Sequence, residues 1–182
     1  MPGGARAGSA GRAGILPDPR ARPSRPPRDP GPPADGVLRR AVRPVKVSLI
    51  AVGRARAPYL DDLAHYEKLL RPYVKLEQIE LRDDADAEQV TRRVPDRAHC
   101  VLLAIEGPAR DSVTQATWLE ERRASGRDLC FVIGGADGLD LPRADERVSF
   151  GPITLPHQLA RVIVLEQLYR AHRILRNEPY HH

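Results

Sequence analysis

Three short loops of this chain contain residue types that suit ligand binding through the backbone. The first, Gly134-Gly135-Ala136-Asp137-Gly138, directly follows an apolar run, and the second, Glu106-Gly107, follows another. The third, Ile153-Thr154-Leu155-Pro156-His157, leads into the last helical pattern. Glycine lets a backbone approach a ligand closely and leaves N–H groups exposed as donors. Three such loops could converge on one ligand of the size of adenosine.

The glycine-rich loop lacks the pattern of a dinucleotide-binding fold. No glycine stands two places after Gly134, so G-x-G-x-x-G is missing and an NAD-dependent enzyme is disfavoured. The chain has two cysteines, Cys100 and Cys130, which are too few for a Cys-rich zinc site or a disulfide framework. Each lies in an apolar run, and we interpret both as packing residues. We predict no metal site.

The elements that must position these loops alternate along the chain. Strand patterns occupy 45–52, 74–81, 100–105, 129–133 and 147–150, and helical patterns occupy 58–70, 83–94, 112–126 and 157–176. Near-continuous apolar strands between helices are typical of an α/β fold whose mostly parallel sheet carries helices on both faces. Ser112 is the predicted N-cap of the third helix. Ligands of such sheets bind beyond the carboxyl ends of the strands, where the first two loops lie.

The last helical pattern is apolar on two opposite sides. Val164 and Leu168 fall on one side, and Val162 and Ile163 fall on the other. A helix that is apolar nearly all round is buried nearly all round. We expect one side to pack on the sheet of its own subunit and the other to pack on a second subunit. Glu166 and Arg170 are four residues apart in the order that favours an ion pair, either structural or at that interface.

The positive charge is confined to the N-terminal tail. Residues 1–44 hold nine Arg and three Asp, a net charge of +6, and the rest of the chain carries a net charge of −1. Ten Pro and seven Gly in the same tail predict disorder. A translation start assigned too far upstream, a functional basic arm and a targeting segment are the three interpretations of this tail. The near-neutral remainder disfavours a non-catalytic RNA-binding module.

The second half of the chain contains longer motifs. The runs Phe131–Gly138, Ile153–Val162, Glu166–Ala171 and Glu178–His181 resemble the ribosomal RNA large subunit methyltransferase H family, a branch of the SPOUT methyltransferases. The resemblance covers 45–182, so 1–44 would be a tail outside that domain. It implies a C-terminal trefoil knot and a cytoplasmic, metal-free homodimer. It also implies methyl transfer from S-adenosylmethionine to N3 of a pseudouridine in 23S ribosomal RNA.

The resemblance also implies site residues. The implied cofactor contacts are Leu103, Gly134, Phe150, Gly151, Pro152, Ile153, Thr154 and Leu155. An imide nitrogen must lose its proton before it attacks, so a cation, N–H donors and a proton acceptor are needed beside it. The candidates for these roles are His157, Arg170, Tyr180 and His181. Composition alone reads the terminal Tyr-His-His as a frayed end, whereas the resemblance places it near the active site, across the dimer.

Overall fold

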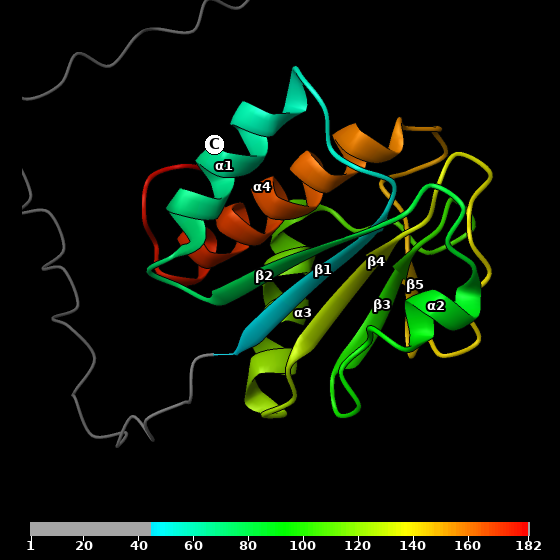
Figure 1. Ribbon diagram of the computed structural model, residues 1–182. Helices are drawn as coiled ribbons and strands as arrows, with labels where there is room; N and C mark the ends of the chain where they lie inside the picture. The colour runs from blue at the N-terminus through cyan, green and yellow to red at the C-terminus, as the bar shows by residue number, and fades with distance from the viewer. Residues whose placement is uncertain (1–44, 182) are drawn as a thin grey trace, which may run out of the picture. The chain divides into compact units, whose positions relative to one another are not determined.

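The computed structural model describes residues 45–181. The predictions made for the 1–44 tail and for His182 lie outside this range. A five-stranded sheet runs through the described chain in the order β2-β1-β4-β3-β5, with every paired strand parallel to its neighbour (Figure 1). The strands are β1 (Lys46–Val52), β2 (Lys75–Leu81), β3 (His99–Leu103), β4 (Leu129–Ile133) and β5 (Glu146–Val148).

Helices cover both faces of this sheet (Figure 1). The helices α1 (Tyr59–Leu70), α3 (Ser112–Ala124) and α4 (His157–Leu175) cover one face, and the short α2 (Ala87–Thr91) covers the other. Each face has its own core. Leu49, Phe131 and Leu165 belong to the larger one, and Ile50, Val90 and Leu102 belong to the smaller one. The predicted α/β class, with a parallel sheet and helices on both faces, is confirmed. So is the burial of both cysteines.

Two helix starts differ from the prediction, and both differences come from aspartate caps. The helix predicted from residue 83 begins only at Ala87, because Asp86 accepts from the Gln89 N–H at 2.8 Å and forms a reciprocal capping box with it. Asp111, rather than Ser112, caps α3 by accepting from the Thr114 N–H at 2.7 Å. The Ser112 hydroxyl instead donates to Gln167 Oε1 on α4.

Helix α4 lies between α1 and α3 on the sheet. Its residues Val164, Leu165 and Leu168 are almost fully buried in the larger core. A strip on its outer side stays only partly buried within the subunit, and this strip contains Leu159, Val162, Ile163, Glu166 and Arg170. The neighbouring helices thus cover part of the apolar surface that the sequence pattern assigned to a second subunit. The outer strip stays partly exposed and is available to a second subunit.

His172, near the end of α4, is 3% exposed and stacks on Tyr73, with ring centroids 5.0 Å apart. Its Nε2 has no hydrogen-bond partner within the part of the chain that the structure describes. Burial, together with the charges of the nearby Arg123 and Arg176, lowers its pKa from 6.5 to about 4. The folded state therefore holds this ring neutral, whereas the unfolded chain binds a proton below pH 6.5.

This difference predicts an acid-dependent loss of stability. Because the folded pKa is depressed, the contribution of His172 is complete above pH 6.5 and is lost as the pH falls towards 4. At pH 5 the free energy of unfolding should be lower than at pH 7 by about 2 kcal/mol from this group. Urea unfolding should show that much less pH dependence in His172→Phe. His65→Phe, at an exposed position, is the control, and an unchanged pH dependence in His172→Phe would contradict the assignment.

Candidate active site

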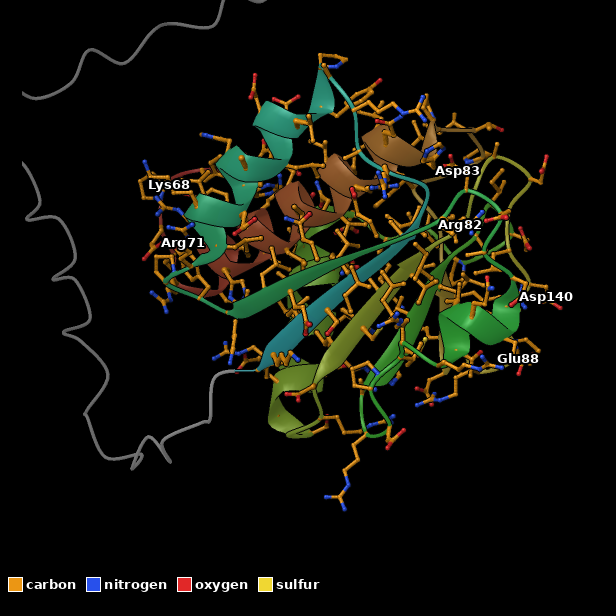
Figure 2. The ribbon with its side chains drawn as sticks, in the orientation of Figure 1. Lys68, Arg71, Arg82, Asp83, Glu88 and Asp140 are labelled. Carbon is orange, nitrogen blue, oxygen red and sulfur yellow. The ribbon has the colours of Figure 1, made fainter. Side chains whose placement is uncertain are left out.

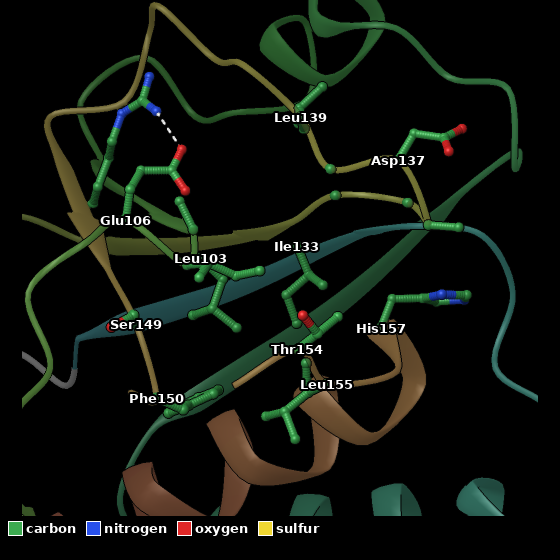
Figure 3. Close-up of a pocket in the computed structure, with 18 of the residues that line it drawn as sticks. Leu103, Glu106, Ile133, Asp137, Leu139, Ser149, Phe150, Thr154, Leu155 and His157 are labelled. Atoms are coloured by element: carbon green, nitrogen blue, oxygen red, sulfur yellow. Dashed lines mark hydrogen bonds and ion pairs between the residues drawn. The ribbon is translucent and has the colours of Figure 1, made fainter. Parts of the chain in front are cut away.

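A cavity of about 580 Å³ lies at the carboxyl ends of β3, β4 and β5. The three loops that the sequence analysis singled out form its walls, so their predicted convergence is confirmed. Figure 3 shows side chains from the ends of β3 and β4, and from the segment between β5 and α4, facing the same space. The cavity has the size of a nucleoside-type cofactor.

Seven of the eight predicted cofactor residues line this cavity. They are Leu103, Gly134, Phe150, Gly151, Ile153, Thr154 and Leu155. The eighth, Pro152, is not part of the lining, although its neighbours on both sides are. The loop that the family motif predicts therefore lies at the cavity, and the assignment of its residues to a cofactor stays a prediction.

The cavity also has an acidic wall that the sequence analysis missed. Glu106, Asp137 and Asp140 line it, and Arg147 is its one arginine. Arg147 donates to Asp140 at 2.6 Å and to Glu106 at 3.5 Å, the second contact being drawn in Figure 3. This arginine ties the loop after β3 to the loop after β4. The sequence does contain a signal for this wall, because all three carboxylates stand within seven residues after the end of a strand.

Gly134 is required by packing within its own loop. A Cβ atom on this residue would lie 2.8 Å from Leu139 Cβ and 2.9 Å from the backbone of Gly138. Atoms this close cannot coexist, so any side chain at 134 pushes the returning 138–139 segment away. Glycine is therefore required at position 134 because these atoms approach so closely. The shape of the cavity wall depends on that close approach.

His157 stands at the opposite wall, beside the turn after β1. Its Nε2 would lie 3.3 Å from a Cβ placed on Gly53. The backbone of Gly53 has φ +91°, a conformation that favours glycine. Burial lowers the pKa of His157, and the charge of Arg161 lowers it further. The ring is thus neutral at physiological pH and has a lone pair that can accept a proton.

Arg161 is the buried support of this wall. The side chain is 2% exposed, and it donates to the Gly53 carbonyl at 2.6 Å and to Glu80 at 2.9 Å. Glu80 also accepts from the Ala55 N–H at 2.7 Å. Together these bonds hold the β1–α1 turn against the start of α4. The sequence signal for such a role is an arginine within a largely apolar helix, and it was not among the predicted site residues.

The other three predicted catalytic residues form a second group around Glu166. Arg170 donates twice to Glu166 Oε1, at 2.8 and 2.6 Å, which confirms the predicted ion pair. The Tyr180 hydroxyl donates to the same oxygen at 3.2 Å, and His181 Nδ1 lies 3.4 Å from Arg170 Nη1. Burial raises the pKa of Tyr180, so its hydroxyl stays protonated.

The C-terminal segment is docked, and the frayed end that composition suggested is wrong for residues 177–181. The Tyr180 ring meets Tyr169 edge-on at 4.8 Å, and Arg170 lies 4.8 Å over it. Glu178 pairs with Arg173 at 2.8 Å and accepts from the Tyr73 hydroxyl at 2.7 Å. These contacts hold the segment on the last turns of α4.

The two groups are far apart within one subunit. His157 begins α4, and Arg170 follows thirteen residues later on the same helix, which is about 20 Å along the axis. The structure therefore places His157 at the cavity, and places Arg170, Tyr180 and His181 together at the other end of α4.

Residues 45–181 contain neither a cluster of metal-binding side chains nor a helix that could cross a membrane. No group of three or more His, Cys, Asp or Glu side chains there could hold a metal ion. None of the helices in that range is both long and apolar enough to cross a membrane.

Comparison with known proteins confirms the resemblance. The family described as "Predicted SPOUT methyltransferase" matches residues 45–181. Proteins named ribosomal RNA large subunit methyltransferase H are similar to the chain. Those from Bacillus pumilus, Listeria monocytogenes and Gemmatimonas aurantiaca are 37%, 38% and 39% identical over 158, 158 and 153 residues. Each of these matches covers 75% of this chain and 99% of the relative. The chain therefore belongs to the SPOUT methyltransferase family, in the branch whose members are named ribosomal RNA large subunit methyltransferase H.

Proposed function

We propose that this methyltransferase uses S-adenosylmethionine to methylate N3 of a pseudouridine in 23S ribosomal RNA. The observation that carries the proposal is the cavity at the ends of β3, β4 and β5, because seven of the eight residues expected to contact that cofactor line it. The names of the relatives supply the substrate, since each is called a ribosomal RNA large subunit methyltransferase.

The residues around the cavity fit this cofactor. Leu103, Ile133 and Leu155 provide apolar contacts for a purine ring, and the backbone around Gly134 comes close enough for N–H contacts. The Glu106 carboxylate suits a ribose diol or a cation, and Asp137 and Asp140 add to the negative potential. S-adenosylmethionine, when bound, supplies a methyl group that is already activated by the sulfonium charge.

The chain's own residues then have to orient the acceptor and manage its proton. The guanidinium of Arg170, held by Glu166, can stabilise the negative charge that develops on an imide carbonyl. The Tyr180 ring can stack on the target base. His181, beside Arg170, and the neutral His157 are the two candidates to accept the N3 proton.

A homodimer brings these groups to the cavity. Within one subunit the Arg170 group is about 20 Å from His157 along α4, too far to act on a base bound at the same cavity. The outer strip of α4 continues into a hollow of about 340 Å³ between α3 and α4, which shares Leu103, Phe150 and Leu155 with the cavity. Two copies packed through this strip can place the C-terminal segment of each at the cavity of the other.

The return of the chain from β5 at the sheet edge to α4 over the middle of the sheet agrees with the trefoil knot that the family implies. We include that knot, the homodimer and a cytoplasmic location in the proposal.

The proposed dimer interface predicts that one negative charge placed on the outer strip of α4 will disrupt the dimer. Ile163→Asp should convert the protein to monomers, because a carboxylate on the strip would lose its hydration against the partner helix. Sedimentation velocity measures the change, and methylation of ribosomes should fall with it. Leu60→Asp, on α1 at a position 51% exposed, is the matched control and should stay dimeric. A dimeric Ile163→Asp would place the interface elsewhere.

Two measurements test the proposed function. S-adenosylmethionine should raise the melting temperature and NAD should not, since a ligand that binds only the folded state stabilises it. Labelled methyl groups should then enter 23S RNA in large ribosomal subunits from cells that lack the modification, and nuclease digestion should locate them on pseudouridine N3. Stabilisation by NAD, or methyl transfer to another position, would overturn the assignment.

A further inference from the structure

We propose that the basic face formed by Lys68, Arg71, Lys75 and Arg176 is the surface that docks on ribosomal RNA phosphates. This inference rests on the proposed function and identifies the surface on which the ribosomal RNA is held. The four residues gather around Tyr73, where α1 ends, β2 begins and α4 ends. Arg176 lies 4.5 Å over the Tyr73 ring, and Arg71 and Lys75 line a shallow hollow with Tyr73.

The cations of this face are available to a ligand. All four residues are exposed. In residues 45–181, Lys68, Lys75 and Arg176 make no ion pair, and Arg71 has only a 3.9 Å contact with Glu67, in which both side chains are largely exposed. Such an exposed contact contributes little and is readily exchanged. Two other nearby acids are already occupied, because Glu77 pairs with Lys46 and Glu178 pairs with Arg173.

At the opposite end of the molecule cations and carboxylates are mixed. The exposed Asp83 and Asp84 after β2 face Arg56 at 3.9 Å and Arg82 at 3.3 Å, respectively. Arg147 pairs with two of the three carboxylates that line the cavity. Figure 2 shows Lys68 and Arg71 at one end of the subunit, and Arg82 among Asp83, Glu88 and Asp140 at the other. The near-zero net charge of residues 45–182 therefore averages one face of exposed cations with regions in which cations and carboxylates are paired. Attraction to a polyanion depends on the local region, since the field is screened within about 8–10 Å.

The basic face adjoins the segment that the proposed reaction needs. Tyr73 carries Arg176 on its ring and donates from its hydroxyl to Glu178, two residues before Tyr180. Arg176 and Arg170 are about 9 Å apart along α4. Phosphates bound at the basic face would thus hold a nucleotide beside Tyr180 and His181, whereas an approach over the acidic cavity wall would be repelled.

The test compares two double variants of the full chain with the same change of charge. Lys68→Glu with Arg71→Glu alters the basic face, and Arg82→Glu with Arg93→Glu alters exposed arginines near α2, on the other side of the sheet. Binding to large ribosomal subunits is measured from about 50 to 200 mM salt. The first variant should bind at least about tenfold more weakly at about 100 mM salt, and its slope of log K against log salt should shrink by about 1.5 to 2.

The other measurements separate the possible outcomes. S-adenosylmethionine affinity should match wild type in both variants, and the control should bind subunits within about twofold of wild type, as expected for a phosphate-specific effect. An equal loss in the control would show that only net charge matters and would overturn the proposal. So would a loss on ribosomal subunits that is absent on protein-free 23S RNA, because the partner would then be a ribosomal protein. Failure of wild type to bind cofactor or transfer methyl groups would instead refute the proposed function.

Discussion

Deletion of Tyr180 to His182 is expected to lower the rate of ribosome methylation by about 10²-fold or more, the scale of one lost acid–base group. The deletion removes the ring proposed to stack on the target base and the imidazole that lies 3.4 Å from Arg170. Arg170 and Glu166 remain, so the loss should appear in kcat more than in the affinity for ribosomes. S-adenosylmethionine affinity should change little, because the expected cofactor contacts come from the loops that line the cavity and none comes from this segment.

The fold should survive this deletion. The Glu178–Arg173 ion pair and the bond from Arg173 to the Pro179 carbonyl precede the cut and keep the helix end in place. Loss of the Tyr180 ring from Tyr169 should cost about 1 kcal/mol. Tyr180→Phe keeps that ring and removes only the interactions of its hydroxyl with Glu166 and Tyr66, and is therefore the matched control, with a smaller loss of rate. Wild-type turnover by the truncated protein would remove Tyr180 and His181 from the site.

Gly134→Ala is expected to weaken S-adenosylmethionine binding by about 10²-fold. The added methyl group would meet Leu139 and the Gly138 backbone at 2.8–2.9 Å. The 138–139 segment has to move, and it carries the part of the wall that continues to Asp140. A displacement of about 1 Å in a binding site can cost a factor of this size. Calorimetry with the folded variant is the measurement.

The neighbouring glycine offers a matched control. A Cβ on Gly135 would meet Val52 Cγ1 at 3.3 Å, a tight contact with the end of a side chain. Gly135→Ala should therefore change cofactor affinity by less than about tenfold. Equal effects at the two positions would show that the close approach at Gly134 is unimportant.

The two variants together test whether the site crosses the dimer. Mixed dimers of Gly134→Ala and the truncated chain contain one site with an intact cavity and an intact partner segment. Mixing the two inactive proteins should restore a measurable fraction of the activity. If the cavity and the segment of the same subunit worked together, every site would carry one defect and mixing would restore nothing.

Much of the fold follows from local patterns in the sequence. A strand buried on both faces is apolar at nearly every position. This made 129–133 recognisable, and also 47–52, where Ser48 is the one polar residue. Once strands and helices alternate, the loops after β3 and β4 have to lie at the same edge of the sheet. The cavity at that edge, and most of its lining, could therefore be predicted. The family motif also predicted that the C-terminal segment lies near the active site, whereas composition alone suggested a frayed end.

The tertiary structure decided which residues meet across large separations in sequence. Tyr73 and Glu178 are 105 positions apart, and Arg161 and Glu80 are 81 apart. No local pattern reports such pairs, because they depend on how α4 seats between its neighbours. The start of α2, by contrast, is set locally by the Asp86 capping box. The close approach that requires Gly134 is set by the return of the 138–139 segment within the same loop. Charge behaves likewise: composition determines its sum, whereas the fold determines that four exposed cations meet where α4 ends and that three carboxylates and Arg147 meet around the cavity.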